Sequence, residues 1–187
     1  MESIRIMVEE HSNVLRMLKV IRKICYKLLI NEGYDIDDFP KIIDFVRTYT
    51  DKHHHGKEED ILFKTMEQEL ERLAKAGAIT GMLIEHDNSR LYMTNLEKGV
   101  DSFKEGNDQA RLDIIANSIC YADLLDRHIE KENNIMYKFA EKMLSDSIKE
   151  FIDEESNKID EEATKIGTQE KYLNILSQLE RKYEVIN

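Results

Sequence analysis

The residues best suited to chemistry in this sequence are its histidines and the glutamates that follow three of them, although the pair His55 and Glu59 lies on the more polar helix face. The chain contains 6 histidines. Glu58 follows His54 by four positions, and Glu132 follows His128 at the same interval. Residues four apart on an α-helix lie one turn apart on the same face. Each pair therefore presents an imidazole nitrogen beside a carboxylate, and transition metals accept both as ligands.

Two further histidines occupy the centres of apolar helix faces. Met7 precedes His11 by four positions and Leu15 follows it at the same distance, while Met82 precedes His86 by four. Apolar residues at this spacing form the face of a helix that turns toward the core. Apolar residues at a similar spacing surround His54 and His128. Each of four predicted helices therefore directs one imidazole inward.

Three consecutive histidines occupy positions 53–55, and the apolar pattern must decide which of them faces the core. Asp51 lies four positions before His55, which places both on a polar face and predicts exposure to solvent. We therefore expect His53 and His55 to lie at the surface or behind the ligands, with His54 as the ligand. No lysine or arginine is expected on the inward faces near His54 or His128.

Inward imidazoles and buried carboxylates together favour a pair of iron ions. A buried carboxylate keeps its charge only when it is paired or bound to metal. A single zinc needs only three or four protein ligands, whereas bridging carboxylates favour two metals close together. A metal-free network of salt bridges that recruits Arg90 is the alternative. The predicted metal ligands are His11, His54, Glu58, His86, His128 and Glu132.

Long helices must position these side chains. Apolar residues recur at helical spacing over residues 3–31, 38–74, 79–104 and 109–144. One proline and 7 glycines leave too few turn residues for a β-rich architecture. The prediction is an all-α protein with an up-down-up-down four-helix bundle in residues 1–145. Ferritin-like di-iron bundles carry Glu-x-x-His motifs, and this sequence has none.

Residues 146–187 are predicted to form a C-terminal helical extension. Ile152, Ile159 and Ile166 repeat every seven positions, as in the seam of a coiled coil. Two interpretations stay open at this point. The extension either pairs with a second chain to form a homodimer or covers the bundle as additional helices.

The composition of the chain limits the binding partners and the cellular location that we expect for it. The chain of 187 residues has a net charge of −11, which disfavours nucleic acid and anionic membranes. No stretch approaches the roughly 18 apolar residues of a membrane-spanning helix. The N-terminus lacks a secretory signal pattern, and two cysteines are too few for a disulfide framework. A cytoplasmic location is therefore expected.

The motifs resemble those of the hemerythrin-like, or HHE cation-binding, family. The resemblance covers about residues 1–145 and is carried by His11 and by the strings at residues 54–63, 85–87 and 128–134. It implies a non-heme di-iron centre with an oxo or hydroxo bridge. It also implies that Glu58 and Glu132 bridge the ions and that the terminal ligands are His11, His54, His86 and His128.

The sequence departs from the oxygen-carrying members of that family. Those proteins have a fifth histidine in an HxxxH pair on the third helix, whereas Met82 and Arg90 flank His86 at this spacing here. Reversible oxygen carriage is therefore not expected. The remaining set is similar to that of iron–sulfur cluster repair proteins, which carry an additional N-terminal domain with a cysteine motif. Because the sequence starts directly at the first predicted helix, we expect neither that domain nor the specific repair function here.

The lack of the fifth histidine should leave a coordination position open in the predicted di-iron site. We consider three functions for such a protein. The first is a protein that binds, senses or detoxifies O2, NO or peroxide, with Tyr121 as a possible inward hydrogen-bond donor. The second is an iron-handling or iron-donating protein related to iron–sulfur cluster repair. The third is an interaction module in which the metal is structural.

Overall fold

The computed structural model describes residues 1–185, apart from the side chain of Ala74, and this part of the chain contains helices and no strand. The helices in the first half are α1 (Glu2–Leu29), α2 (Asp38–Phe45), η1 (Val46–His55), η2 (Glu58–Phe63), α3 (Lys64–Glu69) and α4 (Glu71–Ala76). Those that follow are α5 (Ala78–Lys104), α6 (Ala110–Lys131), η3 (Glu132–Met136), α7 (Tyr137–Met143), α8 (Asp146–Lys165) and α9 (Thr168–Tyr183).

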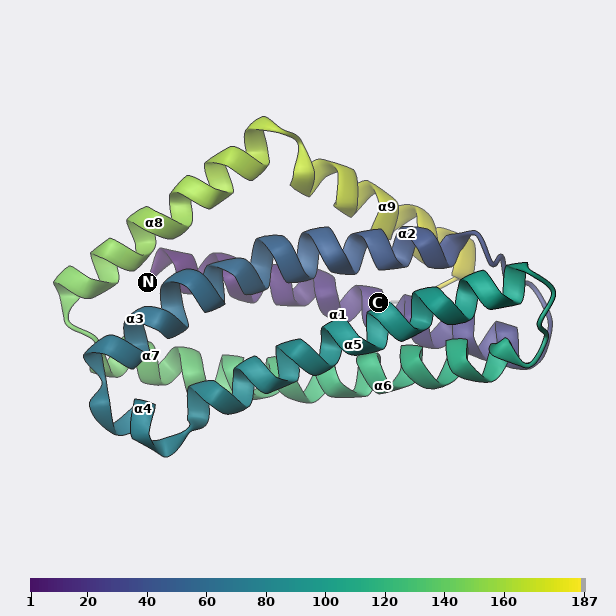
Figure 1. Cartoon of the computed structure of the whole chain (residues 1–187). Coiled ribbons are helices and arrows are strands. Elements are labelled where there is room, and N and C mark those ends of the chain that lie inside the picture. Colours follow the sequence, from purple (N-terminus) through teal and green to yellow (C-terminus); the bar gives the residue numbers. More distant parts are fainter. Residues whose placement is uncertain (186–187) are drawn as a thin grey trace.

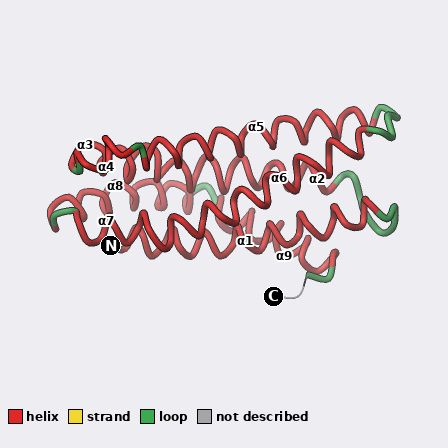
Figure 2. The backbone as a smooth tube through the Cα atoms, turned by 90° about the horizontal axis from the view of Figure 1, so that it is seen from below, coloured by secondary structure: helices red, strands yellow, loops and turns green. Residues whose placement is uncertain are grey.

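Four long helical segments lie alongside one another and form a bundle (Figures 1 and 2). The first is α1, the second runs from α2 to α3, the third is α5, and the fourth runs from α6 to α7. Along the bundle α5 packs on α6, α6 packs on α1, and both α2 and η1 contact α5. The all-helical class and the bundle predicted from the sequence are confirmed.

The second segment is interrupted, whereas the sequence predicted one helix to residue 74. The backbone leaves the helical region at Leu70, with φ −121° and ψ 74°. Leu70 packs against the apolar cluster at that end of the bundle, as does Leu73. Gly77 then adopts the left-handed conformation, φ 71°, which glycine reaches without steric cost and which reverses the chain into α5.

The pairs His54–Glu58 and His128–Glu132 both lie at π-helical segments. The segments η1, η2 and η3 have π geometry, in which each N–H bonds the carbonyl five residues back. A π-turn contains more residues than an α-turn, so side chains after it point elsewhere than a 3.6-residue period predicts. π-helical turns concentrate at functional sites. Here they begin or end at His55, Glu58 and Glu132.

A polar layer separates two apolar cores. Val14, Tyr49 and Met93 belong to one cluster of buried side chains. Met7 and Met82 belong to the other. His11, His54 and His86 fall between the two sets along their helices, and His128 lies beside Ile129 of the first cluster and before Met136 of the second. Apolar packing on both sides therefore holds the helices together while the polar layer stays shielded from water.

The C-terminal helices pack on the bundle. Figure 1 shows α8 leaving the end of α7 and meeting α9 at an apex, from which α9 returns toward α2. Helix α8 contacts α1 and η2, and α9 contacts α1, α2 and η1. Ile152 is fully buried, Ile159 packs against the same apolar cluster, and Ile166 is 71% exposed. Pairing with a second chain stays a prediction.

One carboxylate fastens α8 to the start of α1. Asp153 accepts hydrogen bonds from the backbone N–H of Glu2 at 3.1 Å and of Ser3 at 2.9 Å. These amides lie in the first turn of α1, where no helical partner exists. Asp153 thus supplies the helix cap from a distant part of the chain.

Within residues 1–185, none of the helices has an apolar stretch long enough to cross a membrane.

Candidate metal centre

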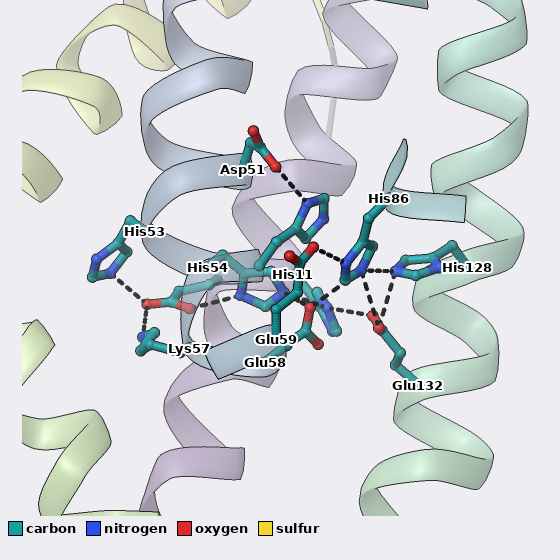
Figure 3. A network of polar contacts seen from close by, with 12 residues as sticks. His11, Asp51, His53, His54, Lys57, Glu58, Glu59, His86, His128 and Glu132 are labelled. Atoms are coloured by element: carbon teal, nitrogen blue, oxygen red, sulfur yellow. Dashed lines mark hydrogen bonds and ion pairs between the residues drawn. The ribbon is translucent and has the colours of Figure 1, made fainter. Parts of the chain in front are cut away.

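Four imidazoles from four helical segments meet in the polar layer (Figure 3). The Nε2 atoms of His11 on α1 and His54 on η1 lie 2.8 Å apart. The Nε2 atoms of His86 on α5 and His128 on α6 lie 2.9 Å apart. Each of these four residues is only 1% exposed. The predicted convergence of one histidine per helix is present in the structure.

Two carboxylates lie between the imidazole pairs. Glu132 approaches Nε2 of His11 at 3.2 Å and Nε2 of His128 at 2.9 Å. Glu58 lies 3.7 Å from Nε2 of His54 and 3.5 Å from Nε2 of His86. Both glutamates are fully buried. Each carboxylate therefore reaches one imidazole of each pair, which is the geometry that a bridging ligand requires.

The ligand atoms divide into two groups that share one carboxylate. Within each group, all candidate ligand atoms lie within 4.8 Å of one another. One group contains His11, His54, Glu58 and Glu132. The other contains His55, Glu58, His86 and His128. Each group could hold a metal ion, and Glu58 belongs to both groups.

The Nδ1 atom of each converging imidazole forms a hydrogen bond with a side-chain oxygen. Four of these bonds cross between helical segments, so that together they connect α1, the second segment, α5 and the fourth segment in a closed ring. The donors and their acceptors are His11 with Asn133 (2.9 Å), His54 with Glu10 (2.8 Å), His86 with Glu59 (2.7 Å) and His128 with Glu85 (2.9 Å). His55 donates to Asp51 at 3.3 Å within its own helix.

This hydrogen bonding prepares the site for cations. A carboxylate or amide oxygen can only accept, so Nδ1 carries the proton and Nε2 of the neutral ring carries the lone pair. Two Nε2 lone pairs 2.8 or 2.9 Å apart repel, so each imidazole pair needs either a shared proton or a metal ion between its nitrogens. Among the described residues, Oε2 of Glu58 and both oxygens of Glu132 are buried without a hydrogen-bond partner. The donor set therefore fits metal ions bound by imidazole and carboxylate.

The two carboxylates differ in the protonation that the metal-free protein favours. Burial and the charge of Glu132 raise the pKa of Glu58 to about 7. Burial would also raise the pKa of Glu132, but His128 and His11 hold it well below its ordinary value. Near neutral pH, Glu58 thus keeps a proton for part of the time. A metal ion must displace that proton to bind both oxygens.

The imidazoles also differ from one another. Burial and the neighbouring His11 lower the pKa of His54 to about 4, so His54 is neutral and ready to act as a ligand. Burial acts in the same direction on His86, but Glu132 and Glu59 outweigh it and raise the pKa of His86 to about 10. Without metal, His86 therefore balances the negative charge of the carboxylates.

His55 lies in the centre, and the prediction that it faces solvent is wrong. It is 2% exposed, and its ring stacks on that of His86 with centroids 3.9 Å apart and planes 8° apart. His53 is also buried, at 5% exposure, but it contacts Glu10 behind the centre. The π-helical geometry of η1 turns three consecutive histidines away from solvent. An α-helical period could not reveal this.

Tyr137 is the hydroxyl at the centre, a place for which the sequence suggested Tyr121. Its hydroxyl donates to Oε1 of Glu58 at 2.5 Å, and its ring stacks on His11 at 5.5 Å. Burial and Glu58 raise the pKa of Tyr137 well above its ordinary value, so the hydroxyl keeps its proton. Tyr121 is fully buried in the apolar core.

Two cations close the outside of the centre: Arg90, which the sequence had indicated, and Lys57, which it had not. Arg90 bonds Asp51 at 2.8 Å and Glu59 at 2.6 Å, and thereby braces the acceptors of two imidazoles. Lys57 is 1% exposed, although no inward cation was expected beside His54. The spacing of residues within one helix cannot predict these contacts, because the partners lie on other helices.

Comparison with known protein families agrees with this geometry. Residues 2–140 match the Hemerythrin HHE cation binding domain. The match runs from α1 into the first half of α7 and includes every residue of the two ligand groups. Comparisons with curated proteins and with solved structures gave no significant match. The chain therefore belongs to the hemerythrin HHE cation-binding domain family.

Proposed function

We propose that this protein holds two iron ions at the centre of an up-down-up-down bundle. The proposal rests on the Nε2 atoms of two imidazole pairs that face each other at 2.8 and 2.9 Å, with unpartnered carboxylate oxygens between them. Two imidazoles and two carboxylates would bind one ion. Three imidazoles would bind the other together with Glu58, which belongs to both groups, and Glu132, which also reaches Nε2 of His128 at 2.9 Å. The full set is His11, His54, His55, Glu58, His86, His128 and Glu132.

The two positions are unequal, which suggests where an external ligand binds. The His11 and His54 position has one imidazole fewer than the position that includes His55. An ion with fewer protein ligands keeps a coordination place for a small molecule. Tyr137 lies against His11 and Glu58, so its protonated hydroxyl holds the shared carboxylate in place beside that position.

Burial limits the ligand to very small molecules. The seven residues of the proposed set are at most 2% exposed. An organic substrate would have to separate the helices to reach them. O2, NO and peroxide are small enough to pass between packed side chains during ordinary fluctuations. Two ferrous ions supply electrons to such ligands when they are bound. We therefore propose that the protein binds, senses or detoxifies O2, NO or peroxide.

Metal content and ligand response test the proposal together. The protein would be expressed with iron, purified without oxygen and analysed for iron per chain. We expect about two irons per chain, in line with the two ligand groups. The absorption spectrum should then change on addition of O2, NO or peroxide, each tested separately.

Other outcomes would favour the alternatives. Two irons that pass readily to a chelator, with no spectral response to the three ligands, would support iron handling or donation. A single zinc, with unfolding on its removal, would support an interaction module with a structural metal. Either result would overturn the proposed reaction with small ligands.

A further inference from the structure

Behind the metal centre lies a second buried cluster of charged side chains, centred on Lys57. Its ammonium donates to Oε1 of Glu10 at 2.6 Å and to Oδ1 of Asp160 at 2.7 Å. Lys57, Glu10 and Asp160 are 1%, 3% and 9% exposed. A lysine is almost never buried this deeply unless it is paired. The two carboxylates supply that pairing.

The cluster touches the metal centre through one residue. The second oxygen of Glu10, Oε2, accepts the Nδ1 proton of His54 at 2.8 Å. His53 donates from Nε2 to Oε1 of the same carboxylate at 2.9 Å. Glu10 thus joins His54 on one side to Lys57 on the other.

The far end of the cluster belongs to the C-terminal extension. Asp160 lies on α8, outside the residues 2–140 that match the family domain. It is 103 positions from Lys57 in the sequence. A chain of direct contacts therefore runs from the extension through Lys57 and Glu10 to an imidazole of the centre.

This cluster is not a third metal site. Glu10, His53 and Asp160 offer ligand atoms within 4.8 Å of one another. The ammonium of Lys57 already lies at hydrogen-bond distance from both carboxylates and supplies the cation that they need. A metal ion would have to displace a buried charge that has two good partners, which is costly.

We propose that Asp160 is a positioning residue for the metal centre and acts through Lys57 and Glu10 on His54. The proposal rests on the proposed function, because it assumes that His54 binds iron. A carboxylate that accepts the Nδ1 proton orients the imidazole and makes its other nitrogen a better ligand. Asp160 draws part of the ammonium charge away from Glu10. Glu10 therefore stays a strong acceptor for His54.

The direction of the effect follows from these charges. Without the charge of Asp160, the ammonium of Lys57 would neutralise Glu10 more fully. Glu10 would then accept the His54 proton less strongly, and Nε2 of His54 would bind the ion less tightly. Loss of such a supporting contact typically weakens a metal site about 10- to 100-fold. Since Asp160 acts indirectly, we expect the lower end, about 10-fold.

The experiment compares the release of iron(II) to a chelator from wild-type protein and from Asp160→Asn, without oxygen. Asp153→Asn is the matched control. It makes the same chemical change on the same helix, at a carboxylate that contacts α1 but does not touch the cluster. We expect about 10-fold faster release from Asp160→Asn and less than about twofold change in the control. Asp160→Glu should restore slow release.

A second comparison separates positioning from a general loss of structure. Glu10→Gln removes the link itself, so Asp160→Asn should add little to it. Equal release from the Asp160 and Asp153 variants, or a full effect of Asp160→Asn in the Glu10→Gln background, would overturn the relay alone. A wild-type protein that retains no iron would overturn the proposed function and the relay with it.

Discussion

Replacement of His55 by glutamine tests the most specific feature of the centre. His55 belongs to the group that also contains Glu58, His86 and His128, and its ring stacks on His86 at 3.9 Å. If it is a ligand, His55→Gln removes one imidazole from the three at that position. It also removes the stacking contact that helps to orient His86.

The magnitude follows from the number of ligands. A structural zinc site with four ligands contributes about 10–16 kcal/mol, or about 2.5–4 kcal/mol per ligand. Since about 1.4 kcal/mol corresponds to a factor of ten, loss of one ligand should weaken binding about 100-fold or more. We expect this loss for one ion and only a small change for the ion at His11 and His54.

Anaerobic competition for iron(II) between the protein and a colorimetric chelator would measure both affinities. His53→Gln is the matched control, because His53 is a buried histidine of the same helix and lies outside both ligand groups. Glutamine at this position can still donate to Glu10. The control should retain both ions within about threefold, because glutamine removes no predicted ligand and can keep the hydrogen bond to Glu10. If the two variants retain iron equally well, His55 is not a ligand and the seven-residue set is wrong.

Three other perturbations probe the centre and its scaffold. Tyr137→Phe keeps the ring on His11 but removes the donor to Glu58, so the free energy of unfolding of the metal-free protein should fall by about 1–3 kcal/mol in denaturant titrations; an unchanged value would exclude a stabilising bond. Gly99→Ala would place Cβ 3.2 Å from Ile114, and the crowding of α5 against α6 should cost about 1–3 kcal/mol in the same measurement. Because burial and Glu132 raise the pKa of Glu58 to about 7, the affinity for iron should fall as the pH drops below 7. Calorimetry in two buffers of different ionisation enthalpy should detect the proton that is released when iron binds. An affinity that stays constant between about pH 6 and 8 would contradict this protonation of Glu58.

Helical periodicity was sufficient for the four segments and for one inward histidine on each. Long apolar stripes average over local irregularities, so the faces of α1, α5 and α6 were predictable. The break at Leu70 was not, because its cause is packing against side chains that are distant in the sequence. Tertiary contacts regularly override local preference at such positions.

The errors at the centre have one geometric cause. Tyr137 follows His128 by nine positions, which is about two and a half turns at 3.6 residues per turn and predicts the opposite face. The π-helical segment η3 lies between them and changes the phase, so both side chains face the centre. The same effect in η1 brings His55 inward. Lys57 was missed for another reason, since its partner Asp160 is 103 positions away.

The ring of hydrogen bonds on Nδ1 also constrains the order in which the protein is assembled. His11 and its acceptor Asn133 are 122 positions apart, and His54 and Glu10 are 44 apart. Contacts at such separations carry a large loop-closure entropy and form late in folding. During synthesis, the centre cannot be completed until the chain as far as Asn133 has left the ribosome and docked on α1. A nascent chain that ends before the fourth segment lacks His128 and Glu132, so loading of the complete site must wait until that segment has joined the bundle.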